Sequence, residues 1–141
     1  MRILSLKDKT SIQKSILNHI EHSLGNHNKD IKNDSLFYST SLSIKDIFSS
    51  RINTTENYII KNNSKKIHYM SIEFLLGRLL QNSLVCLEIE NNYKEALFDL
   101  GIKLEELYEE EKAPAFGNGG LGRLTACYMD SLCTMNYPVY E

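Results

Sequence analysis

The stretch AFGNGGLGRL, from Ala115 to Leu124, holds four glycines whose arrangement suits the binding of an anion. Glycine lets backbone N–H groups approach a ligand closely. The first turn of a helix adds N–H groups without intrahelical partners and a partial positive charge. Arg123 lies where that turn would begin and brings a full positive charge. The loop therefore suits a phosphate or another anion, although a second interpretation stays open, in which the glycines only permit a tight turn.

Gly117, Gly119 and Gly122 satisfy G-x-G-x-x-G, the pattern of dinucleotide-binding loops, but their surroundings do not fit it. That pattern must directly follow a strand. The preceding EELYEEEKAPAF is acidic and contains Pro114, so we expect no strand there. A P-loop needs Lys and then Ser or Thr after its last glycine, whereas this chain has Arg and Leu. Both nucleotide interpretations fail on context.

Other residues with chemical potential are a glutamate, a histidine pair and an acidic run. Glu73 follows the strand candidate at residues 66–72. It either faces a ligand crevice, as residues at strand carboxyl ends do, or only complements a helix dipole. His19 and His22, three apart on a helix, could share a metal, but a solvated helix face is the favoured interpretation and no metal site is expected. The acidic run at residues 105–111 is expected to be solvated surface.

Two helices are expected to precede these residues. In residues 10–25, isoleucine or leucine recurs every fourth position and predicts one apolar helix face. Thr10 with Gln13 fits a capping box, and Gly25 fits the end of the helix. A longer helix is predicted over residues 35–60, with apolar residues, Ile52 among them, near one face.

The second half of the chain is expected to mix strands and helices. Residues 66–72 predict a strand covered on both sides, and helical spacing follows in residues 73–90, 93–101 and 103–112. After the glycine loop, a helix is predicted from Arg123 to Met135, and MNYPVYE begins another strand. The residues of that last helix expected to face inward are Leu124, Cys127, Tyr128, Ser131 and Met135. Helices between strand candidates indicate an α/β arrangement.

Composition excludes several classes of protein. The chain has 141 residues, the size of one domain, with 42% hydrophobic and 24% charged residues. A net charge of −2 argues against a nucleic-acid partner. No apolar run is long enough to span a membrane, and charges in the first nine residues argue against a secretory signal. Three cysteines without a C-x-x-C pair predict reduced thiols in a cytoplasmic protein.

Two long stretches, KKIHYMSIEFLLGRLLQNSL and GNGGLGRLTACYMDSL, resemble signature stretches of the glycogen (α-glucan) phosphorylase family, and they occur in the same order. SIQKSILNHIEHSL is similar to the first helix of that family, so the resemblance runs from about Ser11 to Tyr140. It implies a two-domain glycosyltransferase of the GT-B type, with Rossmann-like domains facing a cleft. Residues 1–64 would form an N-terminal helical segment for dimerisation and regulation, and residues 65–141 the start of the N-terminal α/β domain.

The resemblance implies a reaction and a cofactor. The whole enzyme would cleave terminal α-1,4-linked glucose from glycogen or a related glucan with inorganic phosphate and release glucose 1-phosphate. Pyridoxal 5′-phosphate would be held as a Schiff base on a lysine of a C-terminal domain, and the whole protein would be a cytoplasmic homodimer. This chain then reads as an N-terminal fragment that contains no catalytic residue and is expected to be inactive alone.

The resemblance also implies roles for individual residues of this chain that match functional positions of the family. Glu73, Asn118, Gly119, Gly120 and Leu121 match residues that line the substrate and phosphate site. The resemblance also suggests that Gly120 and Arg123 lie near the cofactor. Cys127 matches a position that some members use in subunit association, and its thiol is expected to be buried.

The chain departs from the family at its regulatory positions. Animal members are allosteric enzymes that bind AMP through an aspartate and a tyrosine, and the matching positions here are His27 and Ile60. That departure argues against AMP activation, and Ser5 is a poor match for the phosphorylated segment of the animal enzymes. Two other functions stay open. One is a non-catalytic carbohydrate-binding or regulatory module derived from a phosphorylase, and the other is a nucleotide-binding protein that rests only on G-x-G-x-x-G.

Overall fold

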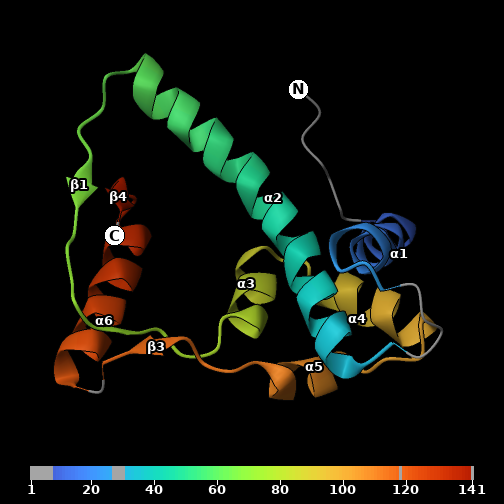
Figure 1. Ribbon diagram of the computed structural model, residues 1–141. Helices are drawn as coiled ribbons and strands as arrows, with labels where there is room; N and C mark the ends of the chain where they lie inside the picture. The colour runs from blue at the N-terminus through green and yellow to red at the C-terminus, as the bar shows by residue number, and fades with distance from the viewer. Residues whose placement is uncertain (1–7, 27–30, 118, 141) are drawn as a thin grey trace. The chain divides into compact units, whose positions relative to one another are not determined.

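The computed structural model describes residues 8–26, 31–117 and 119–140 (Figure 1). The chain divides into two compact units. The first combines Met1–Asn53 with Leu80–Lys112, and the second combines Thr54–Leu79 with Ala113–Glu141. The helices at residues 80–112 thus belong to the same unit as the N-terminal helices. The predicted division of the whole protein at residue 64 stays a prediction.

The first unit begins with α1 (Lys9–Asn18), which a π-helical segment, η1 (His19–Ser23), extends. The N-cap is Asp8, whose carboxylate accepts the Ser11 backbone N–H at 3.2 Å, so the predicted Thr10 capping box is wrong. An aspartate at the N-cap satisfies an N–H group that has no partner inside the helix, as the Thr10 hydroxyl would have done. Gly25 adopts φ 62°, which confirms the predicted end of this segment.

The second helix, α2 (Asn33–Lys61), agrees with the predicted long helix, and its first part belongs to the first unit. Its buried positions include small hydroxyl residues as well as the apolar residues expected from the pattern. Ser43 is fully buried, and its hydroxyl lies 2.8 Å from the hydroxyl of Tyr93. The prediction that Ile52 lies on the buried face is wrong, because its side chain is 57% exposed.

Three further helices complete the first unit: α3 (Leu80–Cys86), α4 (Glu90–Asp99) and α5 (Leu104–Glu110). Helix α4 packs against α1, and Figure 1 shows the two side by side. The shared core is built from isoleucine, leucine, alanine and tyrosine, among them Ile12, Ile16, Leu84, Tyr93, Leu97, Leu104 and Leu107.

Glu111 corrects one expectation about the acidic run. Its side chain is buried, and Oε2 accepts the Leu80 backbone N–H at 2.9 Å. The carboxylate therefore satisfies an N–H group at the start of α3, which no partner inside that helix can reach.

The end of α4 confirms a prediction, because Gly101 adopts φ 79° at the position where that helix was predicted to end.

Two small sheets and one helix form the second unit with the end of α2. Strand β1 (Ile67–His68) pairs in parallel with β4 (Val139–Tyr140), and β2 (Phe74–Leu75) pairs antiparallel with β3 (Ala115–Phe116). Helix α6 (Gly120–Thr134) packs against β2. The described chain is thus a helix-rich mixture with small sheets, compatible with an α/β protein.

The strand predictions for this unit are only partly correct. The strand predicted over residues 66–72 contains only two residues, and both are exposed and not covered on two faces. The helix expected from residue 73 begins at Leu80, because β2 comes first. The absence of a strand before the glycine loop is also contradicted, since β3 directly precedes it. Because β3 pairs antiparallel with β2, it does not supply the parallel βαβ context of a dinucleotide-binding loop.

The predicted inward face of α6 is wrong for this chain. Leu124, Tyr128 and Met135 are 44%, 48% and 57% exposed, and Cys127 and Ser131 are exposed as well. The buried positions of α6 are the small residues Gly122, Thr125 and Ala126. Helix α6 meets its neighbours in this chain through the small residues and leaves the large apolar ones outside. Within the described ranges, no helix has both the length and the apolar character needed to cross a bilayer.

Candidate functional site

The β2–β3 ladder brings Glu73 to the glycine loop. Phe74 pairs with Phe116 across the two strands. Glu73 precedes β2 and Gly117 follows β3, so the antiparallel register places these two residues next to each other. Two features that are 44 positions apart in the sequence therefore share one end of a short ladder.

The carboxylate of Glu73 caps helix α6. Its Oε2 accepts the backbone N–H of Gly122 at 3.1 Å. The N-cap residue, Gly119, has an extended backbone and no side chain that could supply this bond. A negative charge at the N-terminus of a helix is also favoured by the helix dipole. The expected alternative, in which Glu73 begins a helix and complements its dipole, is wrong because β2 follows Glu73; the carboxylate lies instead at the N-terminus of α6.

Three glycines of the loop surround the Glu73 side chain. A methyl group on Gly117 would lie 2.7 Å from Glu73 Cγ, and one on Gly119 would lie 3.0 Å from Oε2. A methyl group on Gly122 would lie 3.1 Å from the backbone nitrogen of Phe74 and 3.3 Å from Glu73 Cβ. These distances are shorter than ordinary van der Waals contact, so a larger residue would require Glu73 or β2 to move.

Gly120, the fourth glycine, is different. A methyl group there would have no atom within 4 Å. Gly120 and Leu121 are the first two residues of α6, whose N–H groups have no acceptor inside the helix. Glu73 accepts the N–H of the next residue, Gly122, so its capping bond is not made to Gly120 or Leu121.

Ser71 and Thr125 fix the turn that carries Glu73. The Ser71 hydroxyl donates to the Glu73 backbone oxygen at 2.8 Å and lies 3.2 Å from the Glu73 backbone nitrogen, from which it accepts. Thr125, fully buried on α6, donates from Oγ1 to Ser71 Oγ at 2.9 Å. Sequence reasoning missed both residues. The Ser71–Glu73 spacing is a local signal for a serine turn, but nothing in the sequence links Ser71 to a residue 54 positions later.

The other predicted site residues are at the surface, and Asn118 lies outside the described residues. Gly119, Gly120, Leu121 and Arg123 are exposed. The exposed Arg123 lies in the first turn of α6, so the expected positive charge is present there.

Cys127 does not have the buried thiol that was expected. It is exposed, as are Cys86 and Cys133. Its position on α6 places it beyond the buried stretch of small residues that contacts β2. Any role in subunit association would therefore use a surface thiol of this chain.

His19 and His22 do not converge on a common site. The ring nitrogens of His19 lie 2.9 Å from Ser23 Oγ and 3.1 Å from an Asp46 carboxylate oxygen. The His22 Nε2 atom lies 4.0 Å from a Glu21 carboxylate oxygen. Across residues 8–26, 31–117 and 119–140, no group of three or more His, Cys, Asp or Glu side chains is arranged to hold a metal.

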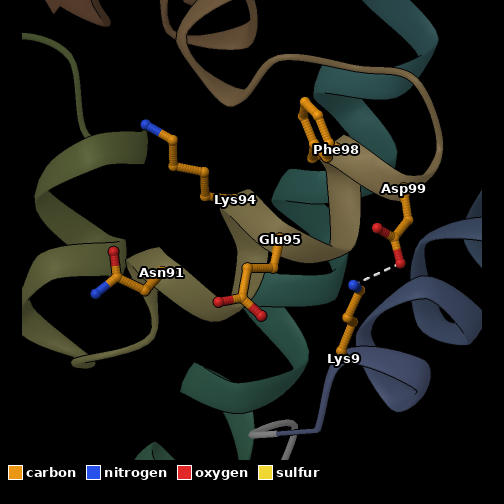
Figure 2. A pocket seen from close by; sticks show the side chains of 6 residues that line it. All are labelled: Lys9, Asn91, Lys94, Glu95, Phe98 and Asp99. Atoms are coloured by element: carbon orange, nitrogen blue, oxygen red, sulfur yellow. Dashed lines mark ion pairs between the residues drawn. The ribbon is translucent and has the colours of Figure 1, made fainter.

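A hollow of about 400 Å³ lies on the first unit, and none of the predicted site residues lines it (Figure 2). It lies over α4, where Phe98 stands exposed among Asn91, Lys94 and Glu95. Lys9 and Asp99 form an ion pair across one edge, drawn as a dashed line in Figure 2. The charges of this hollow are thus of both signs and partly paired.

The second unit has a larger groove of about 820 Å³ between the end of α2 and the end of α6. Its lining is mainly apolar and includes Tyr58, Ile59, Met129 and Tyr137. No predicted site residue lies in this groove either. The candidate site is therefore the exposed surface at the start of α6.

Near the end of α2, Glu56 forms a charged cluster with Lys66 and Tyr140. Lys66 Nζ lies 2.8 Å from a Glu56 oxygen, and the Tyr140 hydroxyl donates to the other. The hydrogen bond from Lys66 holds the pKa of Glu56 below its usual range, and the same bond raises the pKa of Lys66. The Glu56 carboxylate thus accepts hydrogen bonds from both Lys66 and Tyr140. Through these bonds the cluster joins the end of α2 to residues beside and within the β1–β4 sheet, and we assign it a structural role.

Comparison with known proteins identifies relatives across almost the whole chain. Residues 97–141 match the carbohydrate phosphorylase family. The chain is 46% identical to glycogen phosphorylase 2 of Dictyostelium discoideum over 95% of its residues. It is 40% identical to an α-1,4 glucan phosphorylase L isozyme of Ipomoea batatas over 96%, and 35% identical to the brain form of glycogen phosphorylase of Homo sapiens over 98%. The chain spans 14%, 14% and 16% of these three proteins.

Proposed function

Because this chain is a sequence relative of the glycogen and α-glucan phosphorylases over nearly all of its length, we propose that the whole protein is a glucan phosphorylase. It cleaves terminal α-1,4-linked glucose from glycogen or a related storage glucan with inorganic phosphate. The product is glucose 1-phosphate. The observation that carries the proposal is 46% identity along 95% of the chain to a glycogen phosphorylase.

The start of α6 is the part of this chain that we assign to the reaction. Gly120 and Leu121 are exposed at the start of α6, and a phosphate or a sugar oxygen is the kind of acceptor that amides at a helix N-terminus bind. Arg123 adds positive charge in the same turn. Asn118 and Glu73 complete the proposed wall, Asn118 by family position alone. These residues bind and orient; bond breaking requires groups that this chain does not contribute.

The cofactor proposed for the whole enzyme is pyridoxal 5′-phosphate. A Schiff-base lysine needs a pKa lowered by burial or by neighbouring positive charge. Lys66 and Lys94 do not fit this requirement, because hydrogen bonds to Glu56 and Glu105 raise their pKa. From the family resemblance we assign the attachment lysine to a C-terminal domain, and Gly120 and Arg123 to the cofactor's surroundings.

The remaining proposals concern architecture and assembly. Residues 65–141 would begin the first Rossmann-like domain of a GT-B glycosyltransferase. The whole protein would be a cytoplasmic homodimer that associates partly through residues 11–60. AMP activation is not part of the proposal, because Ile60 is an apolar side chain, 70% exposed, at a position where the animal enzymes have a tyrosine. His27 lies outside the described residues.

Two measurements on the whole protein, binding to glycogen and phosphorolysis of glycogen, distinguish a phosphorylase from a non-catalytic carbohydrate-binding module. The purified whole protein should form glucose 1-phosphate from glycogen only when phosphate is present. A protein that is retained by glycogen but forms no glucose 1-phosphate would be the non-catalytic module instead. Tight binding of NAD to the loop in equilibrium dialysis would favour the nucleotide-binding alternative.

The 141-residue chain alone is expected to be inactive. Positioning of glucan and phosphate requires both walls of a cleft, and a displacement of about 1 Å already costs on the order of a hundredfold in rate. Glucose 1-phosphate formed by the purified chain from glycogen and phosphate would contradict this expectation.

A further inference from the structure

The packing around Glu73 gives a structural reason for the glycines at positions 117, 119 and 122, and this reason does not depend on the proposed function. Gly117, Gly119 and Gly122 each border the Glu73 side chain or the start of β2. The adjacent Gly120 borders nothing within 4 Å. The three positions that satisfy G-x-G-x-x-G are therefore the three that Glu73 or the backbone of β2 restricts, and Gly117 also has φ 78°, which favours glycine.

The contacts of Glu73 reach both sides of the loop. At Gly117, a methyl group would meet Cγ, Cδ and Cβ at 2.7 Å, 3.0 Å and 3.1 Å, which is the stem of the side chain. At Gly119 it would meet the carboxylate, and the same carboxylate accepts the Gly122 N–H at 3.1 Å. One side chain thus contacts the loop before, at and after the N-cap of α6.

We infer that Glu73 is the positioning residue of the glycine loop, and that the G-x-G-x-x-G spacing here makes room for the Glu73 side chain and the start of β2 and not for a nucleotide. Ser71 and Thr125 hold the backbone of Glu73, and Glu73 in turn sets the position of the N–H groups of Gly120 and Leu121. The part of this inference that concerns activity rests on the proposed function, whereas the packing part does not.

A double-mutant comparison tests the packing. The change Gly119→Ala forces the Glu73 carboxylate to move, whereas Gly120→Ala enters open space. We expect Gly119→Ala to lower the melting temperature by about 3–6 °C more in the presence of Glu73 than in a Glu73→Ala background. The Gly120→Ala change should have the same effect in both backgrounds. Equal effects of Gly119→Ala in the two backgrounds would overturn the inference.

The amide resonance of Gly122 gives a second readout, which a merely structural role would not produce. In Glu73→Ala, this resonance should move to lower chemical shift, because the N–H loses its acceptor Oε2. It should stay close to its original position in Glu73→Gln, which keeps an acceptor oxygen, and should move in Gly119→Ala, where the carboxylate has moved. A Gly122 resonance that is unchanged in Glu73→Ala would contradict the contact.

Activity of the whole protein completes the test. With Glu73→Ala, the loss of loop position should lower kcat/KM for phosphate at least about tenfold. Glu73→Gln retains an acceptor oxygen and should recover most of that loss. If the glutamine variant is as weak as the alanine variant while the packing results hold, Glu73 acts on the substrate by its charge and is not a positioning residue. If the unsubstituted protein has no phosphorolysis activity, the proposed function fails and the packing results stand by themselves.

Discussion

The change Gly120→Ala in the whole protein should lower activity without lowering stability. A methyl group at this position has no atom within 4 Å, and Gly120 is not among the glycines with positive φ. Its backbone therefore accepts alanine without strain. Alanine is favoured over glycine in helices by up to about 1 kcal/mol, so the free energy of unfolding should stay the same or rise slightly at this first helical position.

The expected loss of activity comes from the approach of the ligand. If a phosphate or sugar oxygen accepts a hydrogen bond from the Gly120 or Leu121 amide, the added methyl group obstructs it. A displacement of about 1 Å near the reacting groups corresponds to a loss on the order of a hundredfold in rate. That ratio equals about 2.7 kcal/mol of transition-state stabilisation.

Gly101 provides the matched control. A methyl group there also has open space, but the residue has φ 79° and lies after α4 in the first unit. Alanine in the left-handed conformation costs roughly 1–2 kcal/mol. Gly101→Ala should therefore lower the melting temperature and leave turnover unchanged, which is the reverse of the result expected for Gly120→Ala.

The assay measures kcat, KM for phosphate and melting temperature for the three proteins. Normal kinetics of Gly120→Ala would mean that no ligand approaches this amide, whatever its melting temperature. A fall in melting temperature as large as that of Gly101→Ala would mean that Gly120 has a structural role, and would refute the reasoning from open space.

Three further predictions concern the 141-residue chain. Tyr93→Phe leaves the buried Ser43 hydroxyl without its partner and should lower the free energy of unfolding by about 1–3 kcal/mol in urea titration, with partial recovery on adding Ser43→Ala. Glu56→Gln should destabilise the chain at pH 7, where the carboxylate is ionised and bonded to Lys66. Because its pKa is lowered on folding, that stabilisation is present above the unfolded pKa of about 4.3 and is lost as the pH falls, so variant and parent should converge in acid. A thiol reagent should modify all three cysteines of the native chain rapidly and only two in Cys127→Ser; a protected Cys127 would contradict its exposure.

Sequence periodicity predicted the N-terminal helices of the first unit because the apolar faces of those helices pack against other helices of the same unit. Ile12 and Ile16 recur at helical spacing and are fully buried. Gly25 and Gly101 adopt the left-handed conformation that ends a helix without strain. The Asp8 cap was not predicted, because the sequence analysis began the helix at Thr10; the helix begins one residue earlier, at Lys9, directly after Asp8.

Periodicity failed in the second unit because it says which residues are apolar and not what covers them. Leu124 and Tyr128 lie on an apolar face of α6, yet both are exposed here. The binding of a phosphate or another anion at the loop stays a prediction. The contact of the Glu73 carboxylate with the loop was not predicted, because it depends on the pairing of β2 with β3, which no local pattern encodes.

The most direct test of the central claim is the identity of the product that the whole protein forms from glycogen. With glycogen and inorganic phosphate, the proposed function predicts glucose 1-phosphate, followed by phosphorus NMR, and no product when phosphate is left out. Free glucose formed at the same rate without phosphate would indicate hydrolysis. That result, or no product in either condition, would contradict the assignment of this protein as a glucan phosphorylase.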